Sequence, residues 1–522
     1  MTSKLDAIDR SEFLVFFEAD VRAVGARTII RKADWIVAYD EARDSHKYLL
    51  GGDIVFEGDT IIHVGGRFDG DVTRTVDGRG LLVMPGLIDV HAHAHRDIHA
   101  KGFFEDLATK HMWMTQLLEY TFVLKGDETS CKAALEASIC SLLRSGCTTL
   151  TELFSFRHTP LDDWIGGLAA TGIRAYVCPM VQSGHWYTTT GRDHLYKWYD
   201  GEGIDDLKGA IELIDAATEH PSGRLRGMVG AAQADTCTET LFVRCKEEAD
   251  RRGIPLQTHA AQSVMEFREM IRRHGKTPIE WLQDIGVLGS NVLLGHAINI
   301  DQHPWVNHHA HGDMERLAGS GVTVVNCARA FAQWGDMLRS HGSYRAAGVN
   351  IALGTDGYPH DMIEEMRISG LVSKVASGHV DMLRTEHVFE AATLGGARAL
   401  GRSDLGCLSV GAKADIVLVD LAHPSMRPVR DPLRSLVYSG VASAVRDVYV
   451  GGDLVVKGGE VLTIDEDAAL EQLQAGQSRA MGRVKDLDWA GREADEISPL
   501  CLPVEGPADD NDRPDAPGKP TF

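Results

Sequence analysis

The sequence predicts an α/β protein built as a (β/α)8 barrel of the TIM type, with a small composite β-domain formed from both chain ends. Three observations lead to this prediction. The central region alternates short apolar runs with helical patterns, and β-rich segments flank that region on both sides. The length of 522 residues suits a barrel accompanied by a smaller domain and a tail.

The central region, residues 83–404, contains eight apolar runs of strand length, each followed by room for a helix. The runs are VMPGLIDVHAHA, TTLTELF, RAYVCPMV, RLRGMVGAAQ, IPLQTHAA, NVLLGHAIN, VTVVNCARA and NIALGTDG. Between the first two, Leu135, Ile139 and Leu142 recur at helical spacing. Because eight is the number of strands at which such a barrel closes, a barrel is favoured over the alternative, an open doubly wound sheet.

The flanking segments, residues 26–82 and 405–462, share a β-rich texture with glycine turns. DIVFEGDTIIHV alternates apolar and polar residues around a Gly-Asp break, as in a hairpin, and KADIVLVDL resembles it. Each segment alone is too short to bury a core, so we expect the two to form one β-domain. Residues 1–25 form an N-terminal extension, 463–498 a helical segment, and the Pro- and Asp-rich residues 499–522 a disordered tail.

The composition excludes several classes of partner. A net charge of −22 argues against nucleic-acid binding and against a polyanionic substrate, although a local basic pocket would override the global field. Nine cysteines without a CxxC pair indicate reduced thiols and a cytoplasmic protein. No apolar run approaches the ~20 residues of a membrane helix, and the N-terminus offers no apolar signal region. We therefore expect an unprocessed chain without membrane or nucleic-acid partners.

Polar side chains end the predicted barrel strands. His91 and His93 end the first strand, His259 the fifth, His296 the sixth and Asp356 the eighth. Residues two apart on a strand point to the same side, and the carboxyl ends of all barrel strands converge on one face. An exposed loop pair is the alternative for His91 and His93, but their place after an apolar strand favours a functional site.

This set of groups predicts a metal centre. Three imidazoles, of His91, His93 and His259, with the carboxylate of Asp356 suit one divalent ion, first of all Zn²⁺, and would accept Fe²⁺, Co²⁺ or Mn²⁺. Such an ion lowers the pKa of a water molecule toward neutrality. Asp356 is predicted to take the water's proton and deliver it to the leaving group. His296 is either a further ligand or, as we favour, a hydrogen-bond donor to the developing oxyanion.

The chain resembles the amidohydrolase superfamily, in its chlorohydrolase and cytosine-deaminase-like branch, which includes triazine and phenylurea hydrolases. The resemblance covers roughly residues 50–460 and is carried by PGLIDVHAH (85–93), THAAQ (258–262), GHAINI (295–300), GTDG (354–357) and ADIVLVD (414–420). It implies a metal at His91, His93, His259 and Asp356, with His296 assisting. From the resemblance alone we also expect a homo-oligomer.

Two positions depart from the pattern of that branch. Binuclear members bridge two metals with a Lys or Glu at the end of the fourth strand, where this chain has Gln233. We therefore expect one metal ion. Aminohydrolases of the branch carry a Glu three residues after the fifth-strand His, where this chain has Gln262, which donates a hydrogen bond but does not readily transfer a proton.

Together these features predict hydrolysis of a non-peptide C–N bond in a small, largely neutral substrate: a urea, amide, carbamate or N-substituted heterocycle. The alternatives are a ring deaminase or chlorohydrolase acting on an aminated heterocycle, and, more remotely, a non-catalytic binding homologue. His185, Gln262 and Trp113 are the predicted substrate contacts, because aromatic and polar side chains in barrel loops suit a flat molecule.

Overall fold

Eight parallel strands form the centre of the protein. The structure is a computed structural model and describes residues 26–107, 123–159 and 163–505. The strands follow one another around the barrel in the order β6, β7, β8, β12, β13, β14, β15, β16. Their bounds are β6 (Leu87–Ala92), β7 (Cys147–Ser155), β8 (Arg174–Val181), β12 (Val229–Gln233), β13 (Leu256–Ala260), β14 (Val292–His296), β15 (Thr323–Asn326) and β16 (Asn350–Leu353). A parallel bridge between Ala92 and Asp356 joins the first strand to the end of the last, which confirms the predicted barrel.

Two of the predicted strand runs are divided. The first predicted run is divided at Pro85, which ends β5 (Leu81–Pro85), and β6 begins two residues later. The predicted domain boundary at residue 82 therefore falls inside β5. The fourth run is divided into β11 (Leu225–Gly227) and β12, both of which pair with β8.

Helices surround the barrel. They are α3 (Glu128–Arg144), α4 (Trp164–Ala170), α5 (Ile204–Thr218), α6 (Glu239–Arg252), α7 (Val264–His274), α8 (Pro278–Asp284), α9 (Asp313–Ser320), α10 (Ala328–Gln333), α11 (His341–Ala346), α12 (Met362–Ser377), α13 (Thr385–Glu390) and α14 (Gly396–Ala399). Several begin at a side chain that caps the free backbone N–H groups: Asp127 accepts from Ser130 before α3, and Ser263 from Glu266 before α7. The apolar faces of these helices pack on the strands in one continuous core.

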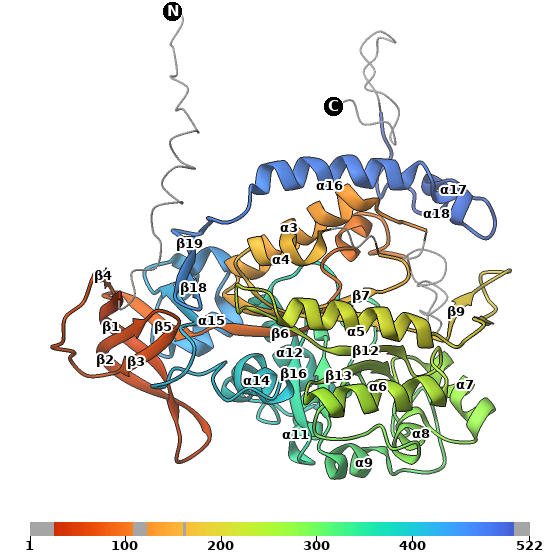
Figure 1. Ribbon diagram of the computed structural model, residues 1–522, viewed down its shortest axis with the longest axis horizontal. Coiled ribbons are helices and arrows are strands. Elements are labelled where there is room, and N and C mark those ends of the chain that lie inside the picture. The colour runs from red at the N-terminus through yellow and green to blue at the C-terminus, as the bar shows by residue number, and fades with distance from the viewer. Residues whose placement is uncertain (1–25, 108–122, 160–162, 506–522) are drawn as a thin grey trace, which may run out of the picture.

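The β-domain joins the two ends of the chain in a second sheet. Its strands are β1 (Arg27–Asp40), β2 (Ser45–Glu57), β3 (Thr60–Val64), β4 (Arg74–Asp77), β5, β17 (Ile416–Asp420), β18 (Val445–Val450), β19 (Asp453–Lys457) and β20 (Glu460–Val461). β17 pairs antiparallel with β5, placing Ile416 opposite Pro85. The sheet has its own apolar core and lies at one end of the barrel (Figure 1). A buried ion pair between Arg174 of β8 and Asp415, 2.9 Å long, ties the two parts together.

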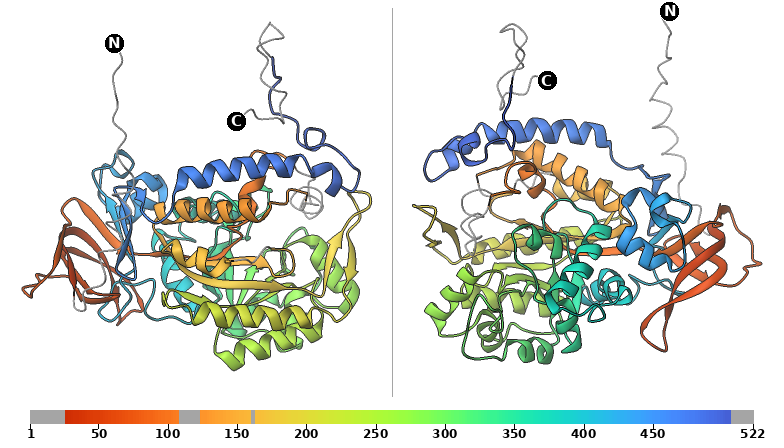
Figure 2. Two further views of the ribbon diagram at one scale, coloured as in Figure 1. Left: turned by 45° about the horizontal axis from the view of Figure 1, so that its top comes forward. Right: turned by 180° about the vertical axis from the view of Figure 1, so that it is seen from behind.

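The C-terminal segment covers the barrel on the side of α3. Helix α16 (Glu466–Met481) lies along α3, and α17 (Val484–Leu487) and α18 (Ala494–Ile497) follow it (Figure 2). The close approach requires Gly476, since a β-carbon there would lie 2.1 Å from that of Ser130. In the described ranges no helix is long and apolar enough to span a bilayer. Residues 1–25 and 506–522, which include most of the predicted tail, lie outside the described residues.

Candidate metal centre and active site

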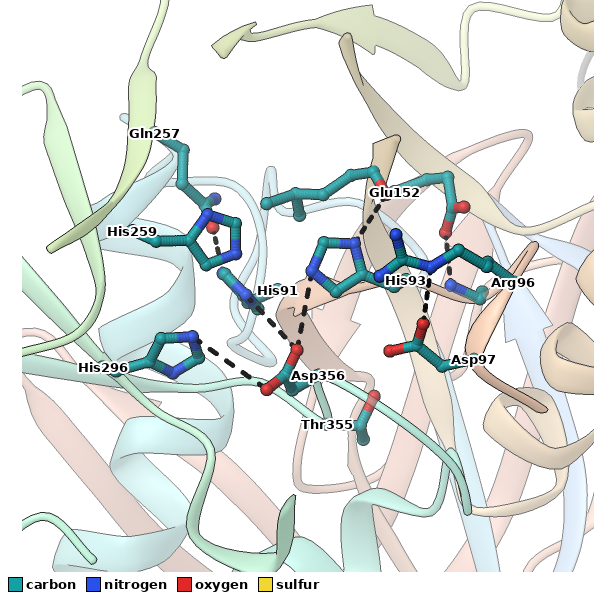
Figure 3. A network of polar contacts seen from close by, with 12 residues as sticks. His91, His93, Arg96, Asp97, Glu152, Gln257, His259, His296, Thr355 and Asp356 are labelled. Atoms are coloured by element: carbon teal, nitrogen blue, oxygen red, sulfur yellow. Dashed lines mark hydrogen bonds and ion pairs between the residues drawn. The ribbon is translucent and has the colours of Figure 1, made fainter. Parts of the chain in front are cut away.

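Four imidazoles and a carboxylate meet at the carboxyl ends of the barrel strands. His91 comes from β6, His93 directly follows it, and His259 and His296 come from β13 and β14. Asp356 lies beyond β16, and its carboxylate points toward His91, His93 and His296 (Figure 3). Its Oδ1 is 3.7 Å from Nε2 of His91 and 3.5 Å from Nε2 of His93. Its Oδ2 is 4.0 Å from Nε2 of His296.

The second ring nitrogen of each predicted histidine ligand is anchored away from the centre. Nδ1 of His91 lies 2.5 Å from Oε1 of Gln257. Nδ1 of His93 and of His259 donates to backbone carbonyls, at 2.9 and 2.6 Å. Because Nδ1 carries the proton, Nε2 presents its lone pair to the other ligands. This is the tautomer that binds a metal ion.

The donor set fits a divalent metal ion. Nε2 of His91 is buried and has no hydrogen-bond partner among the described residues, and the same holds for both ring nitrogens of His296. Nitrogen atoms of His91, His93 and His259 lie within 4.8 Å of one another. Burial lowers the pKa of all three, that of His259 to about 4, so they are neutral and available as ligands. Three neutral imidazoles and one carboxylate are a donor set typical of zinc enzymes.

Gln257 is expected to be the main determinant of the orientation of His91. Its side chain also donates to the carbonyl of Val90 at 2.9 Å, so both ends of the amide are engaged. We expect Gln257→Leu to weaken metal binding about 10- to 100-fold, because the ring loses the partner that fixes its tautomer. Competition with a chromophoric chelator measures the change. The exposed Gln283→Leu on α8 is the matched control, and equal affinities in both variants would contradict the role.

Close backbone packing holds the centre in place. The carboxylate of Asp89, fully buried, accepts from the backbone N–H of His91 at 3.0 Å and from the hydroxyl of Thr355 at 2.6 Å. A β-carbon on Gly295 would lie 2.7 Å from Cε1 of His91, so only glycine fits there. His296 and Asp356 have φ of +80° and +60°, in the left-handed region. Such strained conformations persist where the surrounding structure enforces them.

A cavity of about 450 Å³ opens above the centre. His93, His259 and Asp356 contribute to its floor. Its apolar lining comes from Phe104, Leu124, Met180, Trp186 and Trp334, and its polar lining includes His95, Gln182, Gln233 and Thr236. A concave, largely apolar space of this size with a few polar groups suits a small flat molecule.

Two of the three predicted substrate contacts line this cavity. They are His185, on β9 (Gly184–Tyr187), and Gln262. The Oε1 atom of Gln262 is buried and has no partner among the described residues. Its backbone is held in place because its N–H donates to Glu266 at 2.8 Å and its carbonyl accepts from Asn299 at 3.1 Å. Trp113 lies outside the described residues.

Several residues that support the site were not predicted from the sequence. Gln257 and Asp89 each precede a metal-site histidine by two residues and so lie on the same side of the strand, a signal that was available. Glu152 of β7 accepts from His95 Nδ1 at 2.6 Å, and Glu266 accepts two backbone N–H groups beside Gln262. Both glutamates are buried, and burial raises the pKa of each well above its usual value. The contacts of Glu152 and Glu266 form only in the folded chain, so no local sequence pattern indicates them.

Comparison with known proteins identifies the family. The model of the amidohydrolase family matches residues 82–455, and the chain belongs to this family. The 5'-deoxyadenosine deaminase of Methanosarcina acetivorans is 28% identical over 468 residues, covering 88% of this chain and 99% of that protein. The 5-methylthioadenosine/S-adenosylhomocysteine deaminase of Syntrophobacter fumaroxidans is 30% identical over 407 residues, covering 77% of this chain and 86% of that protein.

Solved structures share the fold. An adenosine deaminase from Xanthomonas campestris with bound zinc superposes with a TM-score of 0.74 at 22% identity, covering 87% of this chain and 98% of that one. The atrazine chlorohydrolase of Arthrobacter aurescens complexed with zinc gives 0.72 at 22% identity, covering 86% and 100%. The family and fold define the chain as a hydrolase that acts on carbon–nitrogen bonds other than peptide bonds.

Proposed function

We propose that this protein is a zinc-dependent hydrolase that cleaves the bond between an sp² carbon and a nitrogen in a small flat molecule. The observation that carries the proposal is a cluster of three histidines, His91, His93 and His259, whose ring nitrogens lie within 4.8 Å of one another. A carboxylate oxygen of Asp356 lies within 3.7 Å of two of them, and the adjoining cavity is lined by aromatic side chains and Gln262. The proposed substrates are ureas, amides, carbamates and N-substituted heterocycles.

The mechanism assigns a role to each group around the centre. His91, His93, His259 and Asp356 would hold the metal ion. When bound, that ion supplies Lewis acidity and lowers the pKa of a water molecule. Asp356 accepts a proton from the attacking water and returns it to the leaving nitrogen, so the amine departs neutral. His296 donates a hydrogen bond to the oxygen on which negative charge develops.

Gln262 favours a substrate that needs no proton from this position. Its amide offers one donor and one acceptor to the cavity, which matches the N–H and C=O edge of a urea or carbamate. A second candidate, deamination of an aminated heterocycle, is favoured by the relatives, since several of them are named as deaminases of adenosine-type nucleosides. Deamination of such a ring calls for protonation of a ring nitrogen, which a glutamine amide does not readily perform.

The substitution Gln262→Glu tests which candidate holds. If the natural substrate is a urea or carbamate, we expect Gln262→Glu to lower kcat/KM for it by about tenfold, since a carboxylate repels the carbonyl oxygen and loses one donor. Ammonia release from adenosine-type nucleosides and amino-triazines should stay low in the natural protein. Rates of amine and ammonia release from both classes measure this. A natural protein that deaminates the heterocycles efficiently would favour the second candidate.

A further inference from the structure

The β7–β8 side of the cavity carries a group of basic side chains that the proposed mechanism does not use. Lys125 precedes α3, His158 follows β7, and His185 lies on β9 after β8. All three line the same cavity as His93, His259 and Asp356. β7 and β8 are adjacent strands, so the loops that carry His158 and His185 leave the barrel side by side. We call these three residues the basic wall of the cavity. Such a group is unexpected in a protein with a net charge of −22.

Acidic side chains do not neutralise this wall. The nearby Asp97 is engaged by Arg96 at 2.8 Å, and Asp206 by Arg157 at 2.7 Å. Within residues 26–107, 123–159 and 163–505, no carboxylate forms an ion pair with Lys125, His158 or His185, although the same ranges contain many ion pairs. Lys125, which is exposed at the cavity lining, thus brings a positive charge that has no ion-pair partner among the described residues.

His185 is held as a hydrogen-bond donor. The Nε2 atom of Gln182 donates to the Tyr199 hydroxyl at 3.0 Å, and that hydroxyl lies 2.9 Å from Nδ1 of His185. The hydroxyl oxygen accepts from Gln182, and we assign its proton to the bond with Nδ1, which leaves the proton of the neutral imidazole on Nε2. The guanidinium of Arg157 lies 4.3 Å above the Tyr199 ring and fixes it further.

Both imidazoles are kept neutral. Burial, followed by the charges of Lys197 and Lys125, lowers the pKa of His185. His158 is exposed, and partial desolvation, followed by the charge of Lys125, lowers its pKa. The wall consequently presents one full charge and neutral N–H donors. One charge balances a monoanion such as a carboxylate, whereas a phosphate carries close to two negative charges at neutral pH.

We propose that Lys125, His158 and His185 form a subsite for a carboxylate group on the substrate, on the β7–β8 side of the cavity. This inference rests on the proposed function, because it describes a second end of the same substrate. The reacting carbon lies at the metal centre, the flat body lies against the aromatic lining, and the carboxylate lies at the basic wall. The substrate class is then an aromatic or heterocyclic acid bearing a urea, carbamate or amino group.

The test measures binding, without turnover, on zinc-loaded protein. Isothermal titration calorimetry compares naphthalene-2-carboxylate with its neutral partner 2-naphthamide. We expect Lys125→Gln to weaken binding of the carboxylate about fivefold and Lys125→Glu to weaken it further, with the amide unchanged within about twofold. Higher salt should weaken carboxylate binding alone. Lys208→Gln, an exposed lysine of α5 outside the cavity lining, is the matched control and should leave both affinities unchanged.

Either of two results would overturn the subsite. One is equal loss of carboxylate binding in Lys125→Gln and Lys208→Gln. The other is carboxylate binding that no Lys125 variant alters, as expected of a carboxylate that ligates the zinc ion. The proposed function fails separately, if the protein binds the carboxylate through Lys125 but hydrolyses none of the ureas, carbamates or heterocycles offered. Hydrolysis of neutral substrates together with unaltered probe binding in Lys125→Gln would refute the subsite alone.

Discussion

Replacing Asp356 with Asn is expected to lower kcat/KM by about 10³-fold or more. The amide has nearly the same shape as the carboxylate and retains an oxygen that can face the metal ion, but it cannot accept a proton from water. Asp356 also lies within 4.0 Å of ring nitrogens of His91, His93 and His296. Burial raises the pKa of Asp356 to about 8, and a divalent ion held beside it would favour its ionised form, which asparagine cannot provide. Steady-state kinetics with the best substrate of the panel, paired with metal analysis, measures both effects.

Metal content decides how this result is interpreted. A variant that keeps its metal and loses activity assigns Asp356 to proton transfer, whereas loss of both assigns it mainly to binding the ion. The exposed Asp205→Asn on α5 serves as the control for a lost carboxylate remote from the site. Activity of Asp356→Asn within about tenfold of the natural protein would refute the proposed role of this residue.

The barrel and the residues at its mouth were predictable because two regularities act together. Apolar runs of strand length define the parallel strands, and the topology brings their carboxyl ends to one face. His91, His259, His296 and Asp356 are far apart in the sequence, yet each follows such a run. Their convergence could therefore be predicted from the fold class alone, without knowledge of side-chain packing.

The division between barrel and β-domain was harder to predict, because β5 and β6 form one uninterrupted apolar run in the sequence. Pairing decides their assignment: β5 hydrogen-bonds to β17, more than 300 residues later, while β6 pairs with β7. Hydrophobic periodicity describes which face of a strand is buried and carries no information about the partner strand. The predicted domain boundary at residue 82 consequently falls inside β5.

The basic wall was not visible in the sequence for a similar reason. Lys125, His158 and His185 are separated by at least 27 positions and lie in three different segments between the barrel strands. None forms part of a basic run, and the total charge of the chain points the other way. The donor role of His185 also depends on Tyr199 and Arg157, whose contacts exist only in the folded chain. A local field of this kind is a property of the tertiary structure.

His296 has two candidate roles, as a metal ligand and as a hydrogen-bond donor to the developing oxyanion. The centroid of its ring lies 4.4 Å from that of Phe331, and neither ring nitrogen has a hydrogen-bond partner among the described residues. Its backbone has a φ of +80°. We expect His296→Asn to lower kcat by about 10²- to 10³-fold with metal content unchanged, because the shorter asparagine amide no longer reaches the position from which Nε2 donates to the developing oxyanion. KM should change little, since this hydrogen bond strengthens only as charge develops. A variant purified with much less metal than the natural protein would instead identify His296 as a ligand.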